Sequence, residues 1–229
     1  MNFRDLVGKL GEERPPRMRC VGGDSSDEFR AWQDGFLAKL HELRGEPLVA
    51  PPLQVEELGR VDCGDHIRLH LRIGSVLQSR IPAYLLIPSG LSERAPAILA
   101  LHGHFVNGKE RVAGVSPGPE AEDDRGDYGL SMARAGYVVL CFDWWGWGER
   151  AEEGFDFGGR EICNVKHNAA VLYGVPLLSI CLSDAQRVLD ALLARSEVDP
   201  DRVGVMGNSF GGRMSMYVTI FDARIRAAL

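Results

Sequence analysis

The stretch RVGVMGNSFGG (residues 202–212) decides the fold, because it joins a short apolar run to a glycine-rich turn and to the start of an amphipathic segment. Residues 202–206 have the composition of a strand buried on both faces, and residues 210–221 carry apolar side chains at helical spacing. The pattern predicts a strand that passes through a sharp turn directly into a helix, with Ser209 at the turn.

The same alternation of strand and helix extends upstream of this stretch. Further short strands are predicted at residues 97–101 and 137–142, and further helices at residues 128–134 and 177–195. Such βαβ units predict the α/β class, with a doubly wound, mostly parallel sheet and helices on both faces. Ligands of these sheets bind beyond the carboxyl ends of the strands, so the loops there are expected to hold any site.

The residues before this region predict two strands and an N-terminal helix. Residues 67–73 and 81–87 alternate apolar with polar or small side chains, as antiparallel strands do. Residues 25–44 repeat apolar side chains every three or four positions, as an amphipathic helix does. We therefore expect an N-terminal helical extension over residues 1–55 and an α/β core over residues 56–229.

Composition excludes several classes of function. The 229 residues include 32 acidic and 26 basic side chains, which gives a net charge of −6. Such a chain lacks the excess of positive charge that proteins use to bind nucleic acid or an anionic membrane. No apolar run is long enough to span a bilayer and residues 1–17 are polar, so we expect a cytoplasmic protein. The five cysteines are widely spaced, which argues against a disulfide framework and a structural zinc. A small-molecule partner fits this composition best.

The turn at Ser209 has the pattern GxSxG, which presents a serine as a nucleophile. Gly207 and Gly211 supply the small residues that a strained turn needs, and the amide of Phe210 at the helix start is a natural oxyanion donor. The alternative is a turn that binds phosphate or only connects strand to helix. A second match at Ser116 has neither a buried strand before it nor an apolar helix after it, so we interpret it as a loop serine.

Two other loops at the same edge of the sheet carry histidine and tryptophan. The amide of His104 is expected to be the second oxyanion donor, because it follows a strand that ends beside the turn. The imidazoles of His102 and His104 have two alternative interpretations. One is a structural role through hydrogen bonds, and the other is direct proton transfer in the reaction. His102, Trp144, Trp145 and Asn208 are candidates for the wall of a substrate pocket, although packing beneath a long loop explains the tryptophans equally well.

Several segments together resemble the α/β-hydrolase superfamily, and within it the branch of acetyl xylan esterases and dienelactone hydrolases. The segments are LHGH (101–104), GYVVL (136–140), GWGER (146–150), GNSFGG (207–212) and DARI (222–225). The resemblance implies a Ser–Asp–His hydrolase with Ser209 as its nucleophile and a small-molecule ester, such as an acetylated sugar, as its substrate. It implies neither a metal nor an organic cofactor.

The catalytic triad of that superfamily is incomplete in this sequence. The acid and then the histidine follow the serine there, but the 20 residues after Ser209 contain no histidine, and their one acid, Asp222, is interpreted as a local structural residue. A serine without a base is a poor nucleophile, so this chain alone is expected to be inactive. We expect the triad acid and histidine beyond Leu229, and an exposed apolar edge on the strand at residues 202–206.

The first functional hypothesis is a carboxylic-ester hydrolase that works through an acyl-enzyme on Ser209. A serine peptidase of the prolyl-oligopeptidase type has the same turn and is the related alternative. The absent histidine leaves a noncatalytic binding protein with a hydrolase fold as the alternative from another class. The long connections at residues 102–127 and 143–175 are candidates for a lid over the site.

Overall fold

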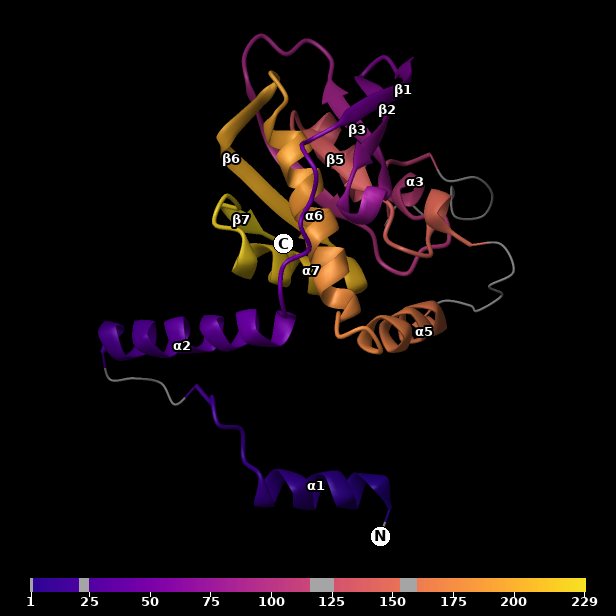
Figure 1. The fold of residues 1–229 in the computed structure, drawn as a ribbon. Helices are drawn as coiled ribbons and strands as arrows, with labels where there is room; N and C mark the ends of the chain where they lie inside the picture. Colours follow the sequence, from indigo (N-terminus) through magenta and orange to yellow (C-terminus); the bar gives the residue numbers. More distant parts are fainter. Residues whose placement is uncertain (1, 21–24, 116–125, 153–159) are drawn as a thin grey trace. The chain divides into compact units, whose positions relative to one another are not determined.

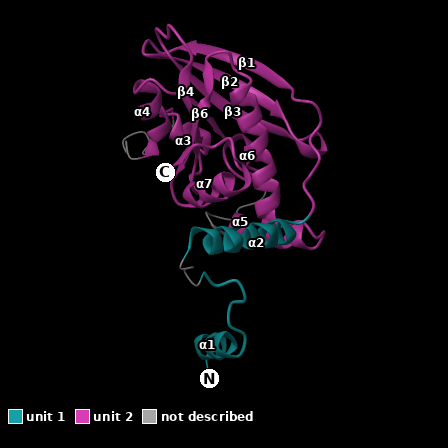
Figure 2. Cartoon of the chain, turned by 90° about the vertical axis from the view of Figure 1, so that its left-hand side faces the viewer, with its two compact units in different colours: residues 1–45 teal, residues 46–229 magenta. Residues whose placement is uncertain are grey.

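The computed structural model describes residues 2–20, 25–115, 126–152 and 160–229, and the chain divides into two compact units, residues 1–45 and 46–229 (Figure 2). Ser116 lies outside the described residues. No described helix is both long enough and apolar enough to cross a bilayer.

The first unit consists of two helices, α1 (Phe3–Glu13) and α2 (Ser26–Arg44). The prediction of a helix at residues 25–44 is confirmed by α2, whose first turn is capped by the hydroxyl of Ser25. Its aromatic rings stack along one side, with 5.2 Å between the ring centroids of Trp32 and Phe36. Helix α1 was not expected from the sequence, and it begins with a reciprocal pair of hydrogen bonds between Asn2 and Asp5.

The second unit is built on a seven-stranded sheet with the order β1-β2-β3-β5-β4-β6-β7 (Figure 1). The strands are β1 (Val55–Asp62), β2 (His66–Gly74), β3 (Arg80–Pro88), β4 (Ala95–Leu101), β5 (Val138–Phe142), β6 (Val198–Gly207) and β7 (Ala227–Ala228). The predicted antiparallel pair is confirmed by β2 and β3, in which Ile67 lies opposite Ile87. The sheet is mixed, because strands β1 to β3 and β5 pair in antiparallel fashion and only β5, β4, β6 and β7 run parallel.

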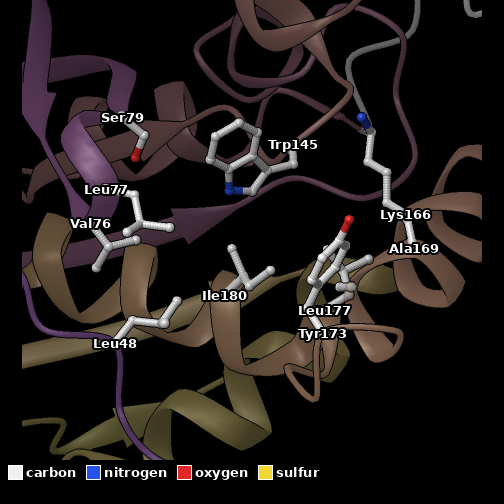
Figure 3. A pocket seen from close by; sticks show the side chains of 11 residues that line it. Leu48, Val76, Leu77, Ser79, Trp145, Lys166, Ala169, Tyr173, Leu177 and Ile180 are labelled. Carbon is white, nitrogen blue, oxygen red and sulfur yellow. The ribbon is translucent and has the colours of Figure 1, made fainter.

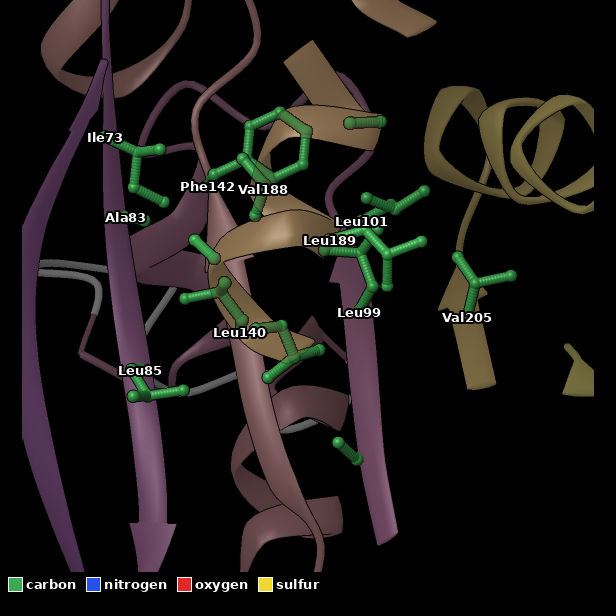
Figure 4. Close-up of a cluster of buried hydrophobic side chains, with 14 of the residues drawn as sticks. Ile73, Ala83, Leu85, Leu99, Leu101, Leu140, Phe142, Val188, Leu189 and Val205 are labelled. Atoms are coloured by element: carbon green, nitrogen blue, oxygen red, sulfur yellow. The ribbon is translucent and has the colours of Figure 1, made fainter. Parts of the chain in front are cut away.

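Helices cover both faces of this sheet, which confirms the predicted α/β class. The helices are α3 (Lys109–Val112), α4 (Tyr128–Arg134), α5 (Arg160–Val171), α6 (Leu177–Leu193) and α7 (Phe210–Phe221), with single 3₁₀ turns η1 (Val76–Gln78) and η4 (Gly148–Arg150). Side chains from α6 and α7 join one buried cluster with Leu85 and Leu99 (Figure 4). Side chains from α3 and α4 join a second cluster with the neighbouring Leu86 and Ile98. Adjacent residues of one strand thus enter opposite cores, as the two-residue period of a strand requires.

The strand that leads to Ser209 is not the edge of the sheet, so that expectation is wrong. Strand β7 pairs with it in parallel, with Gly204 opposite Ala227 and Val205 opposite Ala228. The amide of Leu229 extends the pairing by donating to the carbonyl of Val205 at 3.0 Å. The last residues of the sequence therefore cover the strand that we expected to be open.

The parallel strands place three loops at one edge of the sheet. Strands β4, β5 and β6 end at Leu101, Phe142 and Gly207, and each continues into a connection on that side. The long connection after β5 is not a single loop, because it contains η4 and helix α5. These connections carry the residues that the sequence marked as candidates.

Candidate active site

Ser209 lies between β6 and α7 in a backbone conformation that side-chain-bearing residues rarely adopt. Its φ is +55° and its ψ is −113°, and it occupies the position immediately before the first residue of α7. A non-glycine residue with positive φ is strained, and such strain persists only where the surrounding structure holds it. Ser209 is also exposed, so its hydroxyl is accessible.

Close packing of backbone against backbone explains why glycines flank this serine. A Cβ on Gly207 would overlap the backbone of Gly211, and a Cβ on Gly211 would overlap the carbonyl group of Leu101 at the end of β4. A Cβ on Gly103 would come within 3.4 Å of the Cβ of Ser209. The turn therefore rests directly on the end of β4 and on the loop that follows it.

A pocket of about 470 Å³ opens beside the serine. It is lined by His104, Cys163, Asn164, Ser209, Phe210 and Arg213. His104 belongs to the loop after β4, and its ring stacks on Phe210 with 5.2 Å between centroids. The amides in the first turn of α7, beginning with that of Phe210, have no partner within the helix. Two loops and two helices thus meet around the serine.

Three residues of this pocket were not identified from the sequence. Cys163 and Asn164 come from α5, in a region that sequence analysis treated as a long loop. The Cys163 Sγ lies 3.2 Å from the Nε2 of His104 and links α5 to the loop after β4. Arg213 lies one helical turn after Ser209, a spacing that places both on one side of α7 and could have been recognised. It brings a positive charge to the pocket.

His102 and Trp144 lie in the core, where solvent does not reach their side chains. The Nδ1 of His102 is 2.6 Å from the carbonyl oxygen of Gly103, and its Nε2 accepts a hydrogen bond from the amide of Trp144 at 3.0 Å. The Trp144 indole donates in return to the carbonyl of His102 at 3.1 Å. Burial lowers the pKa of His102 to about 4, which keeps the imidazole neutral. These contacts favour the structural role among the alternatives for both residues.

The other two residues considered for a pocket wall lie apart from this core pair. Asn208 is exposed beside Ser209. Trp145 lines a separate cavity, where the guanidinium of Arg150 stacks 3.7 Å from the centre of its ring. Trp145 is therefore not among the residues that line the Ser209 pocket.

A buried ion pair ties the loop after β4 to the loop after β5. The Lys109 Nζ lies 2.7 Å from a carboxylate oxygen of Asp143, and both side chains are closed off from solvent. The amides of Lys109 and Glu149 donate to the same carboxylate at 2.7 and 3.0 Å. This network fixes the loops that surround the Ser209 pocket. Within the described ranges, no group of three or more His, Cys, Asp or Glu residues could hold a metal ion.

Comparisons with known proteins agree with this fold. The prolyl oligopeptidase family matches residues 179–227, which include Ser209. Protein YtaP of Bacillus subtilis (strain 168), provisionally named a hydrolase, is 28% identical over 197 residues that make up 83% of this chain and 61% of YtaP.

Two solved structures are similar over the whole of this chain. One is from Bacteroides fragilis NCTC 9343, provisionally assigned as an acetyl xylan esterase, with a TM-score of 0.84, 22% identity and 60% of that chain covered. The other is acetyl xylan esterase 1 from Thermoanaerobacterium sp. JW/SL YS485, with a TM-score of 0.57, 22% identity and 62% covered. This chain has the α/β-hydrolase fold, and its resemblance to acetyl xylan esterases is confirmed. It spans about three fifths of the length of these relatives.

Proposed function

We propose that this chain is the nucleophile-bearing part of a serine carboxylic-ester hydrolase that works through an acyl-enzyme on Ser209. The observation that carries the proposal is the exposed serine held at a φ of +55° between a buried strand and a helix N-terminus. A turn of this kind separates the hydroxyl from its neighbours and aims it at the pocket.

In the proposed reaction, the Ser209 oxygen attacks the ester carbonyl and loses its proton to a base. The resulting oxyanion accepts hydrogen bonds from the amides of Phe210 and His104, and the positive end of α7 stabilises its charge. Collapse of this intermediate releases the protonated alcohol and leaves the acyl group on Ser209. Water then attacks the acyl-enzyme by the same route, releases the carboxylic acid and restores the hydroxyl.

The base and the acid that orients it are proposed to lie beyond Leu229. The relatives extend well past the length of this chain, and the triad order of the fold places both groups after the serine. Asp222 does not suit the part of the acid, because both of its carboxylate oxygens accept hydrogen bonds from the Arg224 guanidinium at 2.8 and 2.7 Å. It holds the end of α7 in place.

The proposed substrate is a small ester, and acetylated sugars are the first class to assay. Two structurally similar proteins are named for the deacetylation of xylan, which supports this choice. Arg213 supplies a positively charged donor in the pocket, suited to the hydroxyl and ether oxygens of a sugar.

A serine peptidase is the second candidate, favoured by the match of residues 179–227 to the prolyl oligopeptidase family. An ester and the amide with the same acyl group distinguish the two candidates when they are assayed side by side. Preference for the ester supports the esterase, whereas efficient cleavage of a peptide amide after proline supports the peptidase.

A fluorophosphonate probe tests the nucleophile directly in the full-length protein from its natural source. We expect the probe to label the unmodified protein and to fail with Ser209→Ala. Ser116→Ala is the matched control, because it removes the serine of the other GxSxG match, and labelling should remain. Equal labelling after Ser209→Ala would overturn the proposal. A natural protein that ends at Leu229, folds and escapes labelling would favour the noncatalytic alternative.

A further inference from the structure

A second cavity, of about 420 Å³, lies beside helix α5 (Figure 3). Its walls come from the segment before β1, the connection between β2 and β3, the turn after β5, helix α5 with the turn that follows it, and the start of α6. Most of the lining is apolar, with Val76, Leu177 and Ile180 facing the aromatic rings of Trp145 and Tyr173. The volume is within the range of sites that bind small organic molecules.

Among the described residues that line this cavity, two have a buried polar atom without a hydrogen-bond partner. These atoms are the Nε1 of Trp145 and the Oγ of Ser79. In Figure 3 the indole nitrogen lies on the lower edge of the ring system, on the side of Leu77. Buried donors are satisfied in most native structures, and each unsatisfied one calls for a specific explanation such as a ligand. An indole N–H can only donate and a serine hydroxyl can also donate, so both atoms suit a ligand that offers a hydrogen-bond acceptor.

The neighbouring backbone and side chains hold both donors in place. Leu77 and Gln78, just before Ser79, have φ values of +52° and +62°, because they are the central residues of the tight turn between β2 and β3, which the amide of Ser79 closes by donating to the carbonyl of Val76 at 2.9 Å. The Trp145 ring is held by the stacked guanidinium of Arg150, which is itself paired with the buried carboxylate of Asp184 at 2.8 Å. A tight turn and a stacked ring restrict the motion of the two donors, which lowers the entropy lost when a ligand binds.

We propose that this cavity binds an uncharged, largely apolar molecule of about the size of a substituted benzene, with one oxygen that accepts hydrogen bonds from Trp145 Nε1 and Ser79 Oγ. The charge of the ligand follows from the lining. Among the described residues of the lining, Lys166 alone is charged, and it is paired with Glu152 at 2.5 Å. A charged group on a ligand would therefore have no dedicated counter-ion among these residues. None of the described residues lines both this cavity and the Ser209 pocket, although α5 contributes to both.

Acetophenone and ethylbenzene form a matched pair of probes, because they differ in the carbonyl oxygen and are nearly equal in size. We would titrate each into full-length protein with ¹⁵N-labelled indoles and follow the Trp145 N–H resonance, which Trp145→Phe identifies by its loss. Acetophenone is expected to move this resonance downfield, as a new hydrogen bond does, whereas ethylbenzene is not. Ser79→Ala should weaken acetophenone binding about fivefold and leave ethylbenzene within about twofold, since one neutral hydrogen bond is lost.

Two further variants separate this site from the Ser209 pocket. Ala170→Trp should fill the cavity and abolish the shift, whereas Asn164→Ala, on the part of α5 that lines the Ser209 pocket, should preserve it. The proposal is overturned if acetophenone leaves the Trp145 resonance in place, or if the shift survives Ala170→Trp in a protein whose amide spectrum shows an intact fold. It is also overturned if the resonance moves on dilution alone, because a second copy of the chain would then occupy the cavity.

Discussion

The buried His102 makes the stability of this fold depend on pH between about 4 and about 6.5. The folded protein holds His102 neutral down to about pH 4, because burial lowers its pKa from 6.5. The unfolded chain exposes the same imidazole, which takes up a proton near its ordinary pKa. Between these two values the unfolded state binds one proton more than the folded state, so the free energy of unfolding falls as the pH falls.

The size of the effect follows from the two pKa values. Each pH unit between them is worth about 1.4 kcal/mol, so a change from about pH 7 to about pH 5 should lower the free energy of unfolding by about 2 kcal/mol. Carboxylates contribute mainly below this range. His102→Gln should abolish most of this dependence, because a glutamine keeps an acceptor for the Trp144 amide and does not titrate.

Urea unfolding followed by tryptophan fluorescence at both pH values measures this difference. The matched control is His167→Gln, which removes an exposed histidine and should keep the loss of about 2 kcal/mol. The comparison depends on the change with pH, so a general loss of stability in His102→Gln does not obscure it. If His102→Gln shows the same change as the unmodified protein, the buried neutral imidazole is not the cause and the reasoning is refuted.

The remaining predictions concern the turn and the buried ion pair. Gly211→Ala should cost more than about 3 kcal/mol in urea unfolding, because its Cβ overlaps backbone, whereas Gly59→Ala, with open space around its Cβ, should stay within about 1 kcal/mol. Ser209→Gly should raise the free energy of unfolding by about 1 kcal/mol by relieving the positive φ, and a loss of stability would contradict the strain. Lys109→Met should cost about 3 to 5 kcal/mol by leaving a buried carboxylate unpaired. Lys39→Met, which breaks an exposed pair with Glu42, should cost less than about 1 kcal/mol, and equal losses would refute that explanation.

Much of the fold was predictable because the spacing of apolar residues in the main helices and strands matches the side that each of them buries. The helices α4 and α7 begin and end where the spacing of apolar residues predicted, since each packs one face on the sheet. Strand β1 was missed because all eight of its residues are exposed, and backbone hydrogen bonds to β2 leave no pattern of apolar side chains. Helix α5 was missed for a related reason, because a half-exposed helix in a polar segment resembles a long loop.

The candidate site was predictable where its constraints are local. Ser209 and its flanking glycines belong to one turn, whose steric requirements act over a few residues. The contribution of Cys163 depends on how α5 packs against the loop after β4, and no local pattern encodes that contact. His102, in contrast, was a candidate from its position in the sequence but does not reach the pocket. A histidine beside a candidate oxyanion loop suggests chemistry, and only the three-dimensional fold shows that it is closed off from solvent.

The measurement that tests the central claim most directly is the trapping of the acyl-enzyme. Full-length protein mixed with p-nitrophenyl acetate and quenched in acid within the burst should carry one acetyl group on the peptide that contains Ser209, and Ser209→Ala should carry none. Mass spectrometry of the digested protein shows whether this peptide is acetylated in each of the two proteins. Acetylation of Cys163 or His104 instead, or an unchanged rate of hydrolysis after Ser209→Ala, would contradict the account.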